Sequence, residues 1–332
     1  MALQPDIRSW AEEVLSWIVA THRNSPGRFT NHHRAVGDEQ VWVSVPAQSS
    51  ATFLTALHAV CAEREADINV FISEHVPQRL WQSSPIRYGD IDGRGGVAGS
   101  ESGRYALAWN SGQFTLTIMD RESRVLAYAK EGGFPSSEIG GPLRTPLHWL
   151  VSEQGSAFMH AAALELDGRS VLVCGPSGAG KSTFTQHALV GGAQVAGDDY
   201  VIVRGAHDEF LCYSAYRTIK SKQEGPPELG VASYDLDNGK RAWVLDSEWL
   251  CRKSPICAVA VVGSSGGRHP ERIEPAVAAR VLSTSTMLQV PLYAELIMRT
   301  AASLTGAVPC YRIGWVDSPH DATESIRRMV AA

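Results

Sequence analysis

The segment GPSGAGKST at 175–183 combines three glycines with a lysine that two hydroxyl residues follow. Glycine lets the backbone wrap closely around phosphate oxygens and turn its N–H groups toward them. At this spacing Lys181 can reach the β- and γ-phosphates of a nucleotide, the Ser182 hydroxyl can ligate Mg²⁺, and Thr183 can contact the α-phosphate or cap a helix. The sequence therefore predicts a site for ATP and Mg²⁺, built from Gly175, Pro176, Ser177, Gly178, Ala179, Gly180, Lys181, Ser182 and Thr183.

The flanking segments supply the context that a P-loop needs. The apolar run SVLVC (170–174) reads as a strand, and TFTQHALVGG (183–192) reads as a helix that ends at glycine. A strand that leads through a glycine-rich loop into a helix also directs the positive end of the helix at the phosphates. Asp167-Gly168 is a turn pair, so residues 157–174 should form two strands of a hairpin.

Two adjacent acids follow the predicted P-loop helix. A short apolar strand at 194–196 leads directly to Asp198 and Asp199. Carboxylates beside a triphosphate can ligate Mg²⁺ or accept the proton of a hydroxyl group that attacks the γ-phosphate.

A transferring phosphoryl group also needs positive charge beyond the P-loop lysine. Two pairs of cations that follow the acids could supply it, although each cation could equally be an ordinary surface charge. These pairs are Arg217 with Lys220, and Lys240 with Arg241.

The run MHAAALELDGRSVLVCGPSGAGKSTFTQHALVGGAQVAGDDYVIV (159–203) resembles the catalytic domain of the HPr kinase/phosphorylase family. The pattern of that family is a strand led by histidine, a hairpin, a P-loop, a helix ending in glycine and an Asp-Asp pair. The resemblance implies a nucleotide fold similar to phosphoenolpyruvate carboxykinase rather than to Rossmann-type ATPases. The later segment AVPCYRIGWVDSP (307–319) is similar to the strand with which such domains end.

The resemblance also implies a role for each matched residue. Lys181 matches the phosphate-binding lysine, and Ser182 matches the hydroxyl that ligates the metal. Asp198 matches the base that accepts the substrate proton and Asp199 matches a Mg²⁺ ligand, although the order of these two can be reversed. His160 matches a histidine beside the catalytic acid, which it positions or tunes.

The chain departs from this family in ways that concern the phosphate acceptor. Residues 1–145 do not resemble the regulatory domain of the true enzymes, and Thr183 stands where those enzymes carry an acid. We therefore expect an HPr-kinase-related protein, and HPr itself is not the acceptor that the sequence favours. Some proteins of this group phosphorylate a serine of a lasso-peptide precursor, and the sequence leaves membership of that subgroup open. The expected acceptor is a hydroxyl of a peptide, a protein or a small metabolite, and since relatives tend to assemble, a homo-oligomer is an open alternative.

The segment EGGFPSSEIGGPLRTP (131–146) is rich in glycine, proline and serine and indicates a domain boundary. We expect a smaller α+β domain at 1–145, which would recognise a substrate or partner, and a P-loop kinase domain with a mixed α/β sheet at 146–332. Helical spacing of apolar residues predicts an amphipathic helix within 1–23. Also expected are a helix at 49–65, a loop at 88–104, a helix ending at Gly155, and strands at 41–45, 68–72, 104–109, 113–120 and 124–130.

Composition excludes several classes of function. A net charge of −5 gives no sign of a nucleic-acid partner. No stretch approaches 18 consecutive apolar residues, so no membrane span is expected. The six cysteines contain no CxxC pair, which is typical of scattered thiols in a reducing compartment, and we expect a cytoplasmic protein.

Two other functions are compatible with a P-loop. One is a mechanical ATPase, and the other is a nucleotide-dependent regulator that transfers no phosphate to an acceptor. ATP turnover without a labelled acceptor would indicate the ATPase, and an ATP-dependent change in partner binding would indicate the regulator.

Overall fold

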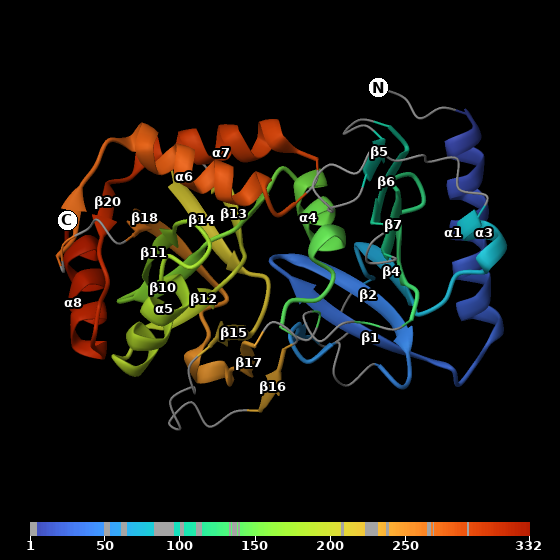
Figure 1. Ribbon diagram of the computed structural model, residues 1–332, viewed down its shortest axis with the longest axis horizontal. Coiled ribbons are helices and arrows are strands. Elements are labelled where there is room, and N and C mark those ends of the chain that lie inside the picture. Colours follow the sequence, from blue (N-terminus) through green and yellow to red (C-terminus); the bar gives the residue numbers. More distant parts are fainter. Residues whose placement is uncertain are drawn as a thin grey trace.

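The computed structural model describes residues 5–49, 54–60, 65–82, 96–99, 103–110, 115–132, 134, 138, 140–206, 209–222, 232–236, 239–263, 267, 269–290 and 292–332. These residues form an eight-stranded sheet from the first part of the chain, a nine-stranded sheet from the second part, and a smaller three-stranded sheet (Figure 1). Helices pack against both large sheets. The fold is therefore mixed α/β, as the sequence predicts.

The N-terminal sheet has the strand order β3-β1-β2-β4-β8-β7-β6-β5. Its strands pair antiparallel, except that β4 runs parallel to both β2 and β8. The five strands expected in this region are all present. The bounds are β1 Phe29–Val36, β2 Glu39–Pro46, β3 His58–Ala59, β4 Ile68–Ser73, β5 Gly96–Gly99, β6 Tyr105–Asn110, β7 Thr115–Asp120 and β8 Val125–Lys130.

Helix α1 (Pro5–Asn24) covers one face of this sheet together with the short helix α3 (Gln78–Gln82), at the right of Figure 1. Its buried side chains recur at helical spacing, as the sequence predicts, and include Trp10, Val14 and Ile18. They form one apolar cluster with the sheet residues that face them. The Trp10 indole also donates a hydrogen bond of 2.8 Å to the carbonyl of Leu80, which ties α1 to α3.

The C-terminal sheet has the strand order β12-β10-β11-β18-β14-β13-β9, with β20 beside β18 and β19 beside β20. Strand β18 pairs in parallel with β11 on one side and with β20 on the other. The other pairs among the described strands of this sheet are antiparallel. The bounds are β9 Ala157–Met159, β10 Ala162–Leu166, β11 Arg169–Cys174, β12 Gln194–Gly197, β13 Val201–Ala206, β14 Glu209–Ser214, β18 Lys253–Val262, β19 Glu271–Arg272 and β20 Cys310–Ile313.

Helices cover both faces of this second sheet. Strand alternation shows which helices lie on which face: Val171 and Val173 of β11 pack in one apolar cluster with α5 (Lys181–Val190) and α8 (Pro319–Val330). Leu172 packs in the other cluster with α6 (Pro275–Met287) and α7 (Ala294–Ala307). A parallel strand covered on both faces is apolar throughout, which is why SVLVC is readable as a strand.

The two large sheets share one apolar core. Leu126 and Tyr128 of the N-terminal sheet belong to the same buried cluster as Leu147 of α4 (Arg144–Glu153) and Val203 of β13. Helix α4 lies between the two sheets in Figure 1. The proposed division between 145 and 146 therefore falls at the start of α4, inside a continuous core, and stays a prediction.

A small sheet with the order β15-β17-β16 lies next to α5. Its strands are β15 Thr218–Ser221, β16 Ser233–Asp235 and β17 Arg241–Val244. The Ser221 hydroxyl donates a hydrogen bond of 3.1 Å to the side-chain oxygen of Gln186. This bond fixes β15 against the P-loop helix.

Three sequence-based expectations are wrong in the described residues. Residues 58–59, expected in a helix, form the edge strand β3, because pairing with β1 overrides their helical preference. Residues 96–99, expected in a loop, form strand β5 against β6. The single strand expected before Asp167 is interrupted at His160 and Ala161, because β9 pairs with β13 whereas β10 pairs with β11 and β12.

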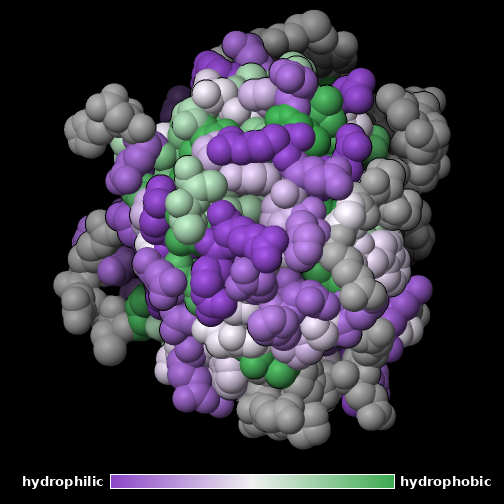
Figure 2. Space-filling view, turned by 90° about the vertical axis from the view of Figure 1, so that its left-hand side faces the viewer, coloured by the Kyte–Doolittle hydropathy of each residue, from purple (hydrophilic) through white to green (hydrophobic). Residues whose placement is uncertain are grey.

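Figure 2 faces the side of the molecule on which α8 lies, and its apolar side chains form small separate areas among hydrophilic ones. Helix α8 buries Ala322, Ile326 and Met329 and turns its charged residues outward, so it contributes hydrophilic side chains to this side. Within the described ranges, no helix combines the length and the apolar composition that crossing a membrane requires.

Candidate active site

The P-loop connects the end of β11 to the start of α5, as the sequence predicts. Gly178 and Gly180 have φ values of 81° and 99°, a region that L-residues with side chains rarely adopt. Gly175 is required for a different reason, since a Cβ at that position would lie 2.7 Å from the carbonyl oxygen of Val262 on the neighbouring strand β18. The conformation of the loop therefore depends on glycine at these three positions.

Lys181 begins α5 and is buried with its ammonium group inside the loop. Its Nζ donates hydrogen bonds of 2.8 Å to the Gly175 carbonyl and 3.4 Å to the Pro176 carbonyl. Burial lowers the pKa of Lys181, and the charges of Asp199 and Asp198 oppose that effect. Phosphate oxygens would bring negative charge to this partly desolvated ammonium, which neutral carbonyls do not provide.

Asp198 follows β12 and is 2% exposed. One carboxylate oxygen, Oδ2, accepts a hydrogen bond of 2.9 Å from the backbone N–H of Lys220 on β15. The other oxygen, Oδ1, is buried and has no hydrogen-bond partner in the described part of the chain. Burial, and then the adjacent charge of Asp199, raises the pKa of Asp198, while the nearby hydroxyls of Thr185 and Ser182 on α5 lower it in part.

Asp199 has quite different surroundings. Its Oδ2 accepts a hydrogen bond of 3.1 Å from the Lys220 ammonium, and its Oδ1 lies 3.5 Å from Nε2 of His160. Burial alone would raise the pKa of Asp199, but Lys220 and His160 hold it well below its usual range. Its side chain is still 30% exposed, so an ionised carboxylate faces the solvent side of the site.

His160 occupies the interruption between β9 and β10, which turns it toward Asp199. Its backbone N–H donates a hydrogen bond of 3.0 Å to the Thr286 hydroxyl of α6, and this bond stabilises the interruption. The ring nitrogen Nδ1 is buried without a partner in the described residues. The structure thus places His160 beside Asp199 rather than beside Asp198.

The donor set beside the P-loop fits Mg²⁺. This ion binds proteins through one or two carboxylates and keeps waters and phosphate oxygens as its other ligands. The Ser182 hydroxyl lies near the Asp198 carboxyl group, and the Oδ1 of that carboxyl group is buried. Hydroxyl and carboxylate oxygens are both hard ligands. Among the described residues there is no group of three or more His, Cys, Asp or Glu side chains that could hold a metal by itself, so phosphate oxygens would have to complete the coordination.

The four candidate cations are arranged differently. Lys220 lies in the site, and Lys240 is close enough to lower the pKa of Lys181 further. Arg217 donates two hydrogen bonds, of 3.1 and 2.7 Å, to the Leu245 carbonyl and so holds the small sheet together. Arg241, on the central strand β17, pairs at 2.8 Å with Asp235 on the edge strand β16. These contacts tie Arg217 and Arg241 to the small sheet and the residue that follows it.

The segment that precedes α4 contributes to the site, whereas the sequence predicts only a domain boundary there. A Cβ at Gly140 would lie 2.6 Å from Cε of Lys220, and one at Gly141 would lie 3.1 Å from its Nζ. The two glycines therefore let the backbone pass directly over the lysine that holds Asp199. Arg144, also missed, donates a hydrogen bond of 3.3 Å to the hydroxyl of Tyr200, the residue after Asp199.

One sequence signal could have identified this segment. Adjacent glycines followed within a few residues by an arginine suggest a backbone that approaches another group closely. The partner of that backbone, Lys220, lies 79 positions further along the chain from Gly141, and only the fold brings the two together.

Comparison with known proteins adds little to this site. No family model matches the chain, and no curated protein matches it. Among solved structures, the HPr(Ser) kinase/phosphatase from Coxiella burnetii is similar to this chain, with 12% identity and a TM-score of 0.31. That match covers 52% of this chain and 96% of the other. A likeness this distant concerns the fold alone, so the function has to be argued from the residues of the site.

Proposed function

We propose that the protein is a Mg²⁺-dependent kinase that transfers the γ-phosphate of ATP to a hydroxyl group. The observation that carries this proposal is the unequal pair of acids beside the P-loop. Asp198 lies near Ser182 and keeps one buried oxygen that has no partner among the described residues. Asp199 is partly exposed and is held ionised by Lys220 and His160. An ionised carboxylate beside a phosphate site is suited to accept the proton of an attacking hydroxyl group, which favours phosphate transfer over binding alone.

Asp198 and Ser182 would hold the metal ion, and Lys181 and the loop N–H groups would hold the phosphates. The ion, when bound, neutralises charge on the β- and γ-phosphate oxygens. This assignment gives Asp198 the part first expected of Asp199. It follows from the position of Asp198 beside the P-loop hydroxyl and from the cost of leaving its oxygen Oδ1 buried without a partner.

Asp199 would accept the proton of the acceptor hydroxyl. In this step the hydroxyl oxygen forms a bond to the γ-phosphorus, the bond from that phosphorus to the β,γ-bridging oxygen breaks, and the hydroxyl proton passes to the Asp199 carboxylate. Lys220 and His160 orient that carboxylate. The low pKa of Asp199 suits a transfer that occurs late, because a hydroxyl becomes strongly acidic only as its bond to phosphorus forms.

The acceptor would be a hydroxyl of a peptide, a protein or a small metabolite. The Asp199 side chain is partly exposed and is bonded to Lys220 of the small sheet, over which the segment before α4 passes. Both of these elements, and the N-terminal sheet behind α4, are therefore placed to form the acceptor surface.

The test is phosphate transfer from Mg²⁺–ATP to pools of lysate proteins, serine peptides and hydroxy metabolites, followed by mass spectrometry. Wild type should label a hydroxyl in one pool. Asp199→Asn should bind ATP and Mg²⁺ as wild type does yet label nothing, and Asp198→Asn should need far more Mg²⁺ for any labelling. Glu324→Gln, which changes an acid of α8 that pairs with Arg327 and Arg328 away from the site, is the matched control and should behave as wild type.

Release of free phosphate without a labelled acceptor in any pool would contradict the kinase and favour an ATPase. Binding of ATP without turnover would favour a regulator. If Asp199→Asn kept full transfer while Asp198→Asn lost it at saturating Mg²⁺, the two acids would have the reverse roles.

A further inference from the structure

An exposed tryptophan lies beside the P-loop. Trp315 is 55% exposed and follows β20, the parallel neighbour of β18, which is in turn the parallel neighbour of the P-loop strand β11. The carboxyl ends of these three strands therefore lie at one edge of the sheet, where open α/β sheets bind their ligands. That arrangement brings Trp315 to the same edge as the phosphate loop.

Trp315 also lines a small cavity with P-loop residues. The walls of this cavity include Ala179, Gly180 and Thr183 from the loop and the start of α5, and Val262 from the end of β18. A Cβ at Gly180 would lie 3.9 Å from Cε2 of the indole. Because position 180 carries no side chain, the indole borders directly on the backbone that would hold the phosphates.

The geometry points to the indole of Trp315 as the stacking platform for the purine ring of the bound nucleotide. This inference rests on the proposed nucleotide site. With the phosphates in the loop, Thr183 is the residue expected at the α-phosphate, and the ribose and base extend from that phosphate. Thr183 and Trp315 line the same cavity, so the base leaves the loop on the side where the indole lies.

The chemistry of this surface favours a purine. A base stacked on an aromatic side chain is held through its π-face, and a purine offers a larger face than a pyrimidine. Four large apolar side chains of the described residues are exposed: Val190, Leu288, Met298 and Trp315. Of these, Trp315 is the one that lines the P-loop cavity.

The experiment compares nucleotide affinity with affinity for the phosphate chain alone. Calorimetric titration with ATP, CTP and inorganic tripolyphosphate, each with Mg²⁺, would be made on wild type, Trp315→Ala and Trp315→Phe. Trp315→Ala should weaken ATP binding on the order of tenfold and weaken CTP binding less. It should leave tripolyphosphate binding unchanged, and Trp315→Phe should restore most of the affinity for ATP.

Met298→Ala is the matched control, because Met298 is 48% exposed and lies on α7, on the other face of the sheet. It should leave all three affinities as in wild type. Equal loss of ATP and tripolyphosphate in Trp315→Ala would overturn the inference, because the indole would then support the loop rather than the base. Unchanged ATP binding would overturn it as well, with the kinase proposal intact. If wild type bound neither ATP nor tripolyphosphate, the proposed nucleotide site itself would be contradicted.

Discussion

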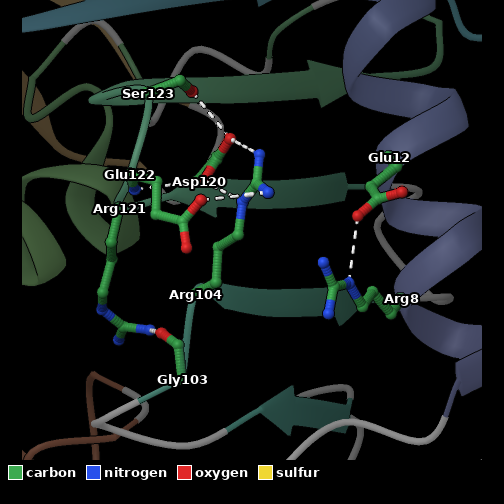
Figure 3. A network of polar contacts seen from close by, with 8 residues as sticks. All are labelled: Arg8, Glu12, Gly103, Arg104, Asp120, Arg121, Glu122 and Ser123. Carbon is green, nitrogen blue, oxygen red and sulfur yellow. Dashed lines mark hydrogen bonds and ion pairs between the residues drawn. The ribbon is translucent and has the colours of Figure 1, made fainter.

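Two buried aspartates, one at the end of a strand in each large sheet, differ in how completely their carboxylate oxygens are hydrogen-bonded. Asp120, at the end of β7, is 3% exposed, and both of its carboxylate oxygens are bound by the guanidinium of Arg104 at 2.9 Å (Figure 3). The Ser123 hydroxyl and the backbone N–H of Glu122 donate to the same carboxylate, at 2.7 and 3.1 Å. Asp198 is as deeply buried but accepts one backbone hydrogen bond and keeps Oδ1 without a partner in the described residues.

The pKa values follow from this difference. Burial raises the pKa of a carboxyl group, but at Asp120 the bonds from Arg104 and Ser123 outweigh burial and the pKa is lowered. At Asp198 burial and the charge of Asp199 prevail, and the pKa is raised. A carboxylate whose hydrogen bonds are all made within the chain stabilises the fold, whereas one that is buried and incompletely bonded is suited to a ligand.

Of the changes at Asp120 and Asp198, Asp198→Asn should have the largest effect, which is on the rate of phosphate transfer. Asp198 is the proposed charged ligand of Mg²⁺, so its replacement should reduce phosphate transfer on the order of 10³-fold. The free energy of unfolding should stay unchanged or rise by about 1 kcal/mol, because an uncompensated buried charge is replaced by an amide that can donate to the neighbouring hydroxyls. Initial rates and thermal unfolding would measure both quantities. A large loss of stability together with activity would show that Asp198, like Asp120, is structural.

A second effect separates the two aspartates through the metal. ADP and Mg²⁺ together at about 100 times the dissociation constant should stabilise wild type by about 2.7 kcal/mol. Asp120→Asn should keep this gain, and Asp198→Asn should lose the part that depends on Mg²⁺. Thermal shifts with ADP, with and without Mg²⁺, would measure the difference. Equal Mg²⁺ dependence in both variants would exclude Asp198 as a ligand.

Sequence reasoning succeeded where one short segment determines the structure. The P-loop, the α5 helix and the strand before the acids are each specified by neighbouring residues, since glycine conformations and apolar strands are local properties. The same is true of α1, whose buried face is visible as helical spacing.

The remaining features depend on contacts between distant segments. Lys220 was one of four candidate cations, and its role became visible only when β15 was placed beside Asp198 and Asp199. Local sequence does not reveal that Arg217 is held by the Leu245 carbonyl. Residues 58–59 similarly form a strand because β1 is there to pair with them. His160 lies beside Asp199 because the chain is interrupted between β9 and β10, and no local sequence pattern indicates that interruption.

The third effect concerns Asp120, where the loss should be of stability alone. Asp120→Asn removes the charge from the bonds with Arg104 and should lower the free energy of unfolding by about 1–2 kcal/mol. This figure allows for solvent screening, because the Arg104 side chain is 34% exposed. Thermal unfolding without nucleotide would measure the loss, and transfer rates below the unfolding range should equal those of wild type. If Asp120→Asn lost phosphate transfer while keeping the stability of wild type, the Asp120–Arg104 network would have a role in activity rather than in folding.

The smallest effect is a difference in pH dependence between the same two variants, measured without Mg²⁺ or nucleotide. The folded-state pKa of Asp198 lies above the ordinary value of 3.8, so the folded protein binds this proton more tightly and the stability it contributes is lost as pH rises through that folded value. Asp198→Asn should therefore gain stability relative to wild type between pH 4 and 7. The folded-state pKa of Asp120 lies below 3.8, so its contribution is present above that value and is lost as pH falls through the folded one.

The stability gap between wild type and Asp120→Asn should accordingly narrow on acidification below pH 4. The other titratable groups are common to the three proteins and largely cancel in these differences. Melting temperatures taken across pH 3–7 would thus give slopes of opposite sign for the two variants. Slopes of the same sign would mean that the oxygen Oδ1 of Asp198 is as fully bonded in solution as the carboxylate of Asp120. That oxygen would then have no need of a metal ion as its partner.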